Sequence, residues 1–143
     1  MMARTDSLLR ILAVVAFIQF LGHGTLFVRA RPTHGPAEEA VVAAMQGERF
    51  KFAAAPRSYW EMYFGYGLEA GCVCLVEAIL FWQLAGLAAR DPLAIRPIAL
   101  LFAGANVAHL AMIARYFAFP LPMVFDGLIA AGLVVVAVVA GRT

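Results

Sequence analysis

Five ionisable side chains lie inside stretches of sequence that are otherwise almost entirely apolar: His23, Glu69, Glu77, His109 and Asp126. Imidazole and carboxylate groups are the side chains that most often carry protons or bind metal ions between helices. A charged group at the centre of a membrane-crossing helix costs about 2.5–3.5 kcal/mol, so it normally faces the protein interior and marks a function. We therefore expect these residues to line a buried polar site.

Counting residues along each helix predicts that four of these side chains share one layer. At 1.5 Å per residue from the longest loop, the depths are about 9, 15, 12 and 10 Å for His23, Glu69, His109 and Asp126. Gln19 and Asn106 lie on the same helix faces as the two histidines, at spacings of four and three residues. Glu77 lies deeper in the membrane and would form a second polar position below this layer. Glu61, Glu69 and Glu77 follow one another at intervals of eight, which predicts an inward-facing stripe.

Several chemistries fit this set of residues. If the site transfers protons, its catalytic residues would be Glu69, His23, His109 and Asp126. The same four residues could instead bind a metal ion. The two histidines could also hold haem as axial ligands. A quinone or another lipid-soluble molecule could bind in a pocket whose further lining residues would be Asn106, Glu77, Tyr63, Tyr66, Gln19 and Arg115. The alternative is structural, because buried polar groups also hold helices together.

The composition places this chain in a membrane. Hydrophobic residues make up 64% of the 143 residues and charged residues 14%, whereas soluble domains are about half apolar and about a quarter charged. The net charge of +2, without a dense basic run, gives no reason to expect nucleic acid as a partner. Cys72 and Cys74 form no disulfide or zinc pattern and are expected to be packing residues.

Four segments are long enough to cross a bilayer as helices: residues 8–28, 59–89, 93–117 and 119–140. The last two connections are short, so we expect an all-α, up-down four-helix bundle in a single transmembrane domain. The first segment could instead be a signal peptide cleaved near Ala30, but its length and the polar Gln19 and His23 favour a membrane span.

The first connection, residues 29–58, is long enough to carry structure of its own. Pro36 followed by two glutamates, with Gly47 as a stop, predicts a short helix over residues 37–46. We expect it to lie at the membrane interface. Five basic residues, including Arg4, lie on the side of the termini and six on the side of this loop. The basic residues on the side of the termini lie in short segments, where the positive-inside rule applies best, and this favours cytoplasmic termini. The predominance of Arg over Lys and the high Ala content indicate a GC-rich bacterial genome.

Two stretches resemble a known family. "LRILAVVAFIQFLGHGTLF" is similar to the first helix of DoxX-like membrane proteins, and "GLEAGCVCLVEAILFWQLAGLAAR" is similar to their second helix. The resemblance implies a small four-helix protein of the bacterial inner membrane, sometimes associated with quinone-linked or thiol redox complexes. His23 and Glu69 are the positions to which it assigns importance.

Two functional hypotheses follow from these patterns. The chain could handle a lipid-soluble ligand at its polar site, with membrane lipids around it and with or without catalysis. Alternatively, it could be a non-catalytic accessory subunit of a larger membrane complex, or form a homo-oligomer. No soluble catalytic domain is recognisable in the sequence, which favours the second hypothesis.

Overall fold

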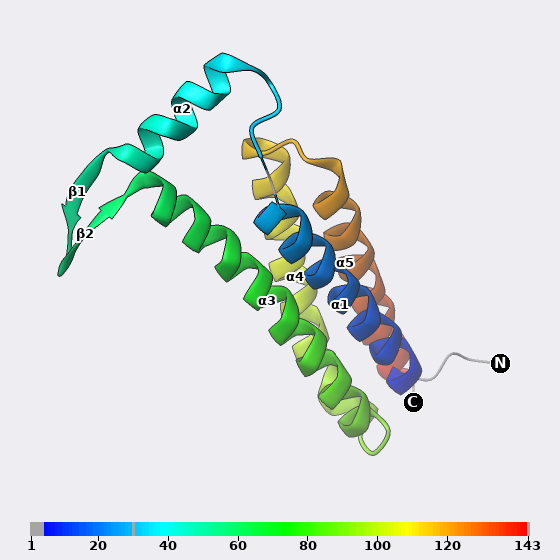
Figure 1. Cartoon of the computed structure of the whole chain (residues 1–143). Helices are drawn as coiled ribbons and strands as arrows, with labels where there is room; N and C mark the ends of the chain where they lie inside the picture. Colours follow the sequence, from blue (N-terminus) through cyan, green and yellow to red (C-terminus); the bar gives the residue numbers. More distant parts are fainter. Residues whose placement is uncertain (1–4, 30, 143) are drawn as a thin grey trace. The chain divides into compact units, whose positions relative to one another are not determined.

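The computed structural model describes residues 5–29 and 31–142, which form five helices and one two-stranded sheet (Figure 1). In chain order the elements are α1 (Thr5–Arg29), α2 (Pro36–Gly47), β1 (Arg49–Phe52), β2 (Ala55–Ser58), α3 (Tyr59–Ala88), α4 (Pro92–Tyr116) and α5 (Pro120–Ala140). Arg4 and Ala30, which entered the predictions of orientation and cleavage, lie outside the described residues.

Four of the described helices are long and apolar enough to cross a membrane: Thr5–Thr25 within α1, and α3, α4 and α5 over their full lengths. These bounds agree with the predicted spans to within a few residues, which supports the prediction of a multi-pass helical membrane protein. With 30 residues, α3 is about 45 Å long. That length exceeds the hydrocarbon thickness of about 30 Å.

The chain divides into two compact units. The first, which we call the bundle unit, holds residues 5–20 and 74–142. The second, the loop unit, holds residues 21–29 and 31–73. Both α1 and α3 contribute residues to each unit.

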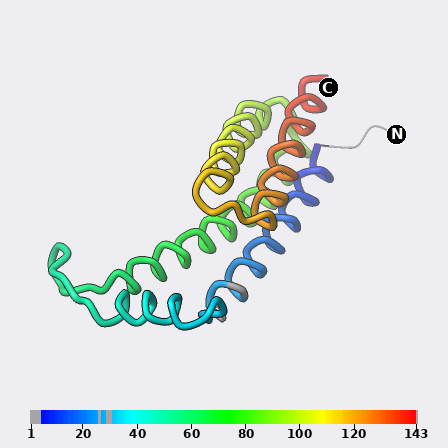
Figure 2. Tube along the Cα trace, turned by 90° about the horizontal axis from the view of Figure 1, so that it is seen from above, coloured from blue at the N-terminus to red at the C-terminus, as the bar shows by residue number. Residues whose placement is uncertain are grey.

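The bundle unit has a hydrophobic core to which α1, α3, α4 and α5 all contribute. Leu9, Phe81, Ile95 and Leu133, one from each helix, are at most 1% exposed. Many of the remaining core residues are alanines, and small side chains let helix backbones approach closely in a membrane. α4 and α5 run side by side in both views (Figures 1 and 2). Only residues 117–119 connect them, so the two helices are antiparallel.

Leu12 of α1 packs against α5 at Gly132. A β-carbon built at this position would lie 2.5 Å from Leu12 Cδ2 and 3.3 Å from Leu12 Cγ. Leu12 is 6% exposed, so it has little space into which it could move. The absence of a side chain at Gly132 therefore allows α1 and α5 to pack together.

We expect Gly132→Val to lower the free energy of unfolding by about 2 kcal/mol, as overpacking of a filled core does. Unfolding in mixed micelles of increasing SDS content measures this loss. Gly104→Val is the matched control, since no atom lies within 4 Å of a β-carbon there, and it should change stability by less than about 0.5 kcal/mol. Adding Leu12→Ala to Gly132→Val should restore part of the loss. Equal effects of the two valines would contradict the proposed packing.

In the loop unit, α2 confirms the predicted short helix. Pro36 opens it, and Glu38 and Glu39 occupy its first turn. Glu38 Oε2 accepts hydrogen bonds from the backbone N–H groups of Thr33, at 2.6 Å, and His34, at 2.7 Å. His34 Nδ1 lies 3.0 Å from the same oxygen. One carboxylate therefore ties the start of α2 to the segment that precedes it.

These hydrogen bonds make the turn before α2 sensitive to pH. The backbone N–H groups of His34 and then Thr33 hold the pKa of Glu38 below its usual value of 4.5. A lowered pKa in the folded state means that the stabilisation is present above pH 4.5 and is lost as pH falls through the lower folded pKa. We expect the amide proton signals of Thr33 and His34 to titrate together in NMR spectra, with a midpoint below 4.5. A midpoint at or above that value, or the same titration in Glu38→Ala, would contradict this.

The loop unit also contains a β-hairpin that the sequence did not predict. β1 and β2 pair antiparallel, with Arg49 opposite Ser58 and Phe52 opposite Ala55. The two-residue turn between them contains Ala53 with φ of 51°, a left-handed conformation that usually selects Gly, Asn or Asp. Because the turn is Ala-Ala instead, the usual sequence signal for a hairpin is missing.

Candidate functional site

Asp126 is the most deeply buried ionisable side chain of the bundle unit, at 1% exposed. It lies in the second turn of α5, and the residues three, four and seven positions further on are all core residues: Ile129, Ala130 and Leu133. Positions at this spacing share one face of a helix. The apolar pattern of α5 therefore turns Asp126 toward the interior.

Gln19 reaches Asp126 from α1. It lies three and seven residues after the buried Ala16 and Leu12, so it shares their face, and it is 7% exposed. Gln19 Nε2 donates a hydrogen bond to Asp126 Oδ1 at 2.9 Å. This bond joins the first and last membrane helices through two buried polar side chains.

His109 reaches the same carboxylate from α4. Its Nδ1 atom lies 2.9 Å from Asp126 Oδ2, the distance of an ion pair. The two groups are not aligned as a hydrogen bond, and Oδ2 lacks an aligned donor among the described residues. The His109 side chain is 43% exposed whereas that of Asp126 is 2% exposed. The imidazole thus connects a buried carboxylate to the outer surface of the unit.

Two buried oxygen atoms of this cluster have no aligned hydrogen-bond donor among the described residues: Gln19 Oε1 and Asp126 Oδ2. Both are acceptors. A buried polar atom left without a partner costs about 1–3 kcal/mol. The cluster can therefore accept further hydrogen bonds from a group that carries N–H or O–H donors.

A second polar pair lies in the same unit. Asn106 Nδ2 donates to Glu77 Oε1 at 2.7 Å and to the Phe102 carbonyl at 3.0 Å, which uses both of its N–H groups. Glu77 on α3 is close enough to Asp126 and His109 for their charges to interact. Five polar side chains from four helices thus form one group, which we call the polar cluster: Gln19, Glu77, Asn106, His109 and Asp126.

The polar cluster differs from the predicted layer in two members. Gln19 and Glu77 make the contacts on α1 and α3 that we expected of His23 and Glu69. The depth count assumed that each span enters the membrane where its helix begins, but α3 has 30 residues, more than a bilayer needs. Its site residue therefore lies two turns further along. Glu69 belongs to the loop unit and is exposed, so its part in the predicted stripe and site stays a prediction.

His23 belongs to the loop unit, where its ring is held by neighbouring groups. His23 Nε2 lies 2.7 Å from the Gly67 carbonyl oxygen. A carbonyl can only accept, so Nε2 must donate. The Phe27 ring stacks on the imidazole at 5.7 Å and 9°, and a β-carbon at Gly67 would overlap that ring. With the proton on Nε2, the lone pair that an axial haem ligand needs would be on Nδ1. Haem between His23 and His109 stays a prediction.

The remaining candidates lie on exposed surfaces. Tyr63 contacts Phe27 and Trp60, with ring centroids 5.6 and 5.7 Å apart. Tyr66 is 67% exposed. The guanidinium of Arg115 lies 5.3 Å from the centre of the Tyr116 ring, at the end of α4. An Arg and a Tyr at a span end are typical of the membrane interface.

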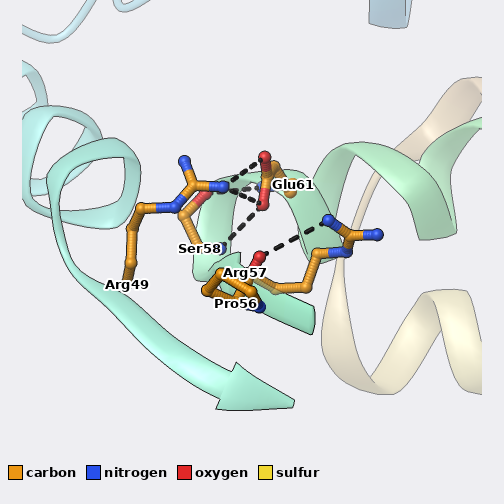
Figure 3. A network of polar contacts seen from close by, with 5 residues as sticks. All are labelled: Arg49, Pro56, Arg57, Ser58 and Glu61. Carbon is orange, nitrogen blue, oxygen red and sulfur yellow. Dashed lines mark hydrogen bonds and ion pairs between the residues drawn. The ribbon is translucent and has the colours of Figure 1, made fainter. Parts of the chain in front are cut away.

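Glu61, the first member of the predicted stripe, caps a helix instead. Its backbone N–H donates to Ser58 Oγ at 3.1 Å, and the backbone N–H of Ser58 donates to Glu61 Oε2 at 2.9 Å. This reciprocal pair is a capping box. Arg49 from β1 donates to the same carboxylate at 3.0 and 3.3 Å (Figure 3). The sequence "SYWE" carries the Ser-x-x-Glu signal that could have predicted it.

Within the described part of the chain, no group of three or more His, Cys, Asp or Glu side chains is arranged to hold a metal ion. Comparison of the chain with protein-family models, curated proteins and solved structures found no match.

Proposed function

We propose that this chain is an integral membrane protein whose polar cluster binds the head group of a lipid-soluble molecule. The ligand would bring hydrogen-bond donors to Gln19 Oε1 and Asp126 Oδ2. A hydroxyl-bearing molecule with an apolar tail, such as a quinol or an isoprenoid alcohol, has this chemistry. The bacterial inner membrane, cytoplasmic termini and a DoxX-like ancestry are parts of the same proposal.

The observation that carries the proposal is a pair of buried acceptors without an aligned donor in the described part of the chain: Gln19 Oε1 and Asp126 Oδ2. The Asp126 carboxylate is 1% exposed, and among the same residues its Oδ2 atom has only the ion pair with His109 at 2.9 Å. Polar contacts that serve only to hold membrane helices together stabilise them by about 0.6 kcal/mol on average. Burial of a carboxylate opposes folding unless its oxygens are paired and hydrogen-bonded. A ligand that completes the hydrogen bonding of Asp126 would offset part of that cost.

Access to the cluster comes through His109, because this side chain is 43% exposed. Met112, three residues further along α4 and therefore on the same side of the helix as His109, is apolar and 53% exposed. A molecule with an apolar tail could lie along this side of α4 while its head group reaches the carboxylate. Such an arrangement suits a ligand that arrives from the bilayer.

The test is to purify the full chain in mild detergent and to identify the molecules that remain bound by mass spectrometry of an organic extract. We expect one hydroxyl-bearing or amine-bearing lipid-soluble molecule in a near-stoichiometric amount. An extract that holds only bulk phospholipids, in the proportions of the source membrane, would overturn the proposal and leave a purely structural role for the cluster.

A further inference from the structure

The hairpin and the start of α3 form a second surface with its own chemistry. An open groove of about 410 Å³ is lined by Phe52, Arg57, Glu61 and Met62. All four residues belong to the loop unit. We propose that this groove binds the phosphate of an anionic phospholipid through Arg57, with the apolar part of the lipid lying against Phe52.

The register of the hairpin gives its two faces different characters. Phe50 is paired with Arg57 and Phe52 with Ala55, and directly paired residues of antiparallel strands lie on the same face. Arg57 therefore shares a face with both phenylalanines. Because side chains alternate along a strand, Arg49 and Lys51 lie on the opposite face. One cation set among aromatic rings suits a ligand that is charged at one end and apolar at the other.

The guanidinium of Arg57 is available to an anion. It donates a long hydrogen bond to the Pro56 carbonyl at 3.4 Å, and the side chain extends away from Arg49 (Figure 3). The nearby carboxylate of Glu61 is already neutralised by Arg49 at 3.0 Å. Residues 49–58 contain three basic residues and no acidic residue. The surface is therefore complementary in charge to a phosphate.

The position of the hairpin in the chain favours a lipid over a soluble anion. β2 ends at Ser58, and the membrane helix α3 begins at the next residue. Tyr59 and Trp60 open that helix, and Tyr and Trp are enriched where a span meets the head groups. Phe52 at the hairpin tip is 53% exposed. An exposed phenylalanine beside an arginine can contact the acyl chains of a lipid whose phosphate binds the arginine.

The test is native mass spectrometry of the full chain in detergent, titrated separately with dioleoylphosphatidylglycerol and dioleoylphosphatidylcholine. We expect the natural chain to bind dioleoylphosphatidylglycerol more tightly than dioleoylphosphatidylcholine. Arg57→Gln should weaken that binding about tenfold or more, as expected when a charge-assisted contact to phosphate is lost. Lys51→Gln is the matched control, because it removes the same charge from the other face of the hairpin, and it should change binding about twofold or less.

Inorganic phosphate separates a lipid site from a general anion site. Phe52→Ala should weaken binding of the phospholipid, and added inorganic phosphate should not displace the lipid. Equal losses in Arg57→Gln and Lys51→Gln would overturn the proposal in favour of diffuse attraction. An unchanged affinity in Arg57→Gln, or displacement of the lipid by inorganic phosphate, would also overturn it. None of these variants alters the polar cluster, so their outcome is independent of the proposed function.

Discussion

Asp126→Asn will lose the bound molecule while keeping the fold. In a purified preparation we expect the amount of co-purifying ligand per chain to fall about tenfold or more, because hydrogen bonds to a charged group contribute about 1.5–3 kcal/mol. Asparagine has nearly the same shape as aspartate, so the core residues on the same face of α5 can pack as before. Quantitative mass spectrometry of the organic extract measures the change.

The physical reason lies in the second oxygen of the carboxylate. The amide oxygen of the Asp126→Asn variant could still accept the hydrogen bond from Gln19 Nε2 that Asp126 Oδ1 receives at 2.9 Å. In place of Oδ2, however, the variant would present an N–H₂ group to His109 and to the ligand. A donor would then meet the donors of the ligand, and the negative charge opposite the imidazole would be gone.

Asp91→Asn is the matched control for this variant. Asp91 caps α4, where its side chain accepts from the backbone N–H of Ala94 at 3.1 Å. Asparagine caps helices as well as aspartate does, so this change removes a carboxylate of the bundle unit without cost to the fold. Unchanged ligand content in Asp126→Asn, or an equal loss in Asp91→Asn, would contradict the role that we assign to the buried carboxylate.

Phe81→Ala will cause the largest loss of stability. Phe81 is fully buried, and its ring meets that of Phe102 edge to face at 5.6 Å and 80°. Truncation of a buried phenylalanine costs about 3–5 kcal/mol, since it removes packing contacts and leaves a cavity. Unfolding in mixed micelles of increasing SDS content measures the change in free energy.

Phe117→Ala controls for the loss of a ring at an exposed position. Phe117 is 71% exposed, and its truncation should change stability by less than about 0.5 kcal/mol. If Phe81→Ala cost no more than this control, the core of the bundle unit would not be packed around Phe81.

The membrane helices were predictable because their signal is local and strong. Each span is a long apolar run, and the turn between α3 and α4 is marked by Asp91 and Pro92, which act as N-cap and first helical residue. The sequence also predicted α2, from Pro36 and the glutamates that follow it. The hairpin escaped prediction, since Ala53 adopts a positive φ without the Gly or Asn that normally announces it.

The candidate site was predictable in its chemistry and only partly in its members. His109 and Asp126 lie together, as expected from similar depths on neighbouring helices. On α3, a count from the first residue of the helix selected Glu69, whereas Glu77 is the residue that accepts a hydrogen bond from Asn106. Gln19 was placed as a companion of His23, yet it is the α1 residue that contacts the carboxylate.

The most direct test compares two probes that differ only in a hydrogen-bond donor. The natural chain in detergent is titrated with farnesol and, separately, with the methyl ether of farnesol, and both affinities are measured by native mass spectrometry. Because Gln19 Oε1 and Asp126 Oδ2 are acceptors without an aligned donor among the described residues, we expect the alcohol to bind about tenfold or more tightly than the ether. Equal affinities for the two probes, or no binding of the alcohol, would contradict a ligand site at the polar cluster.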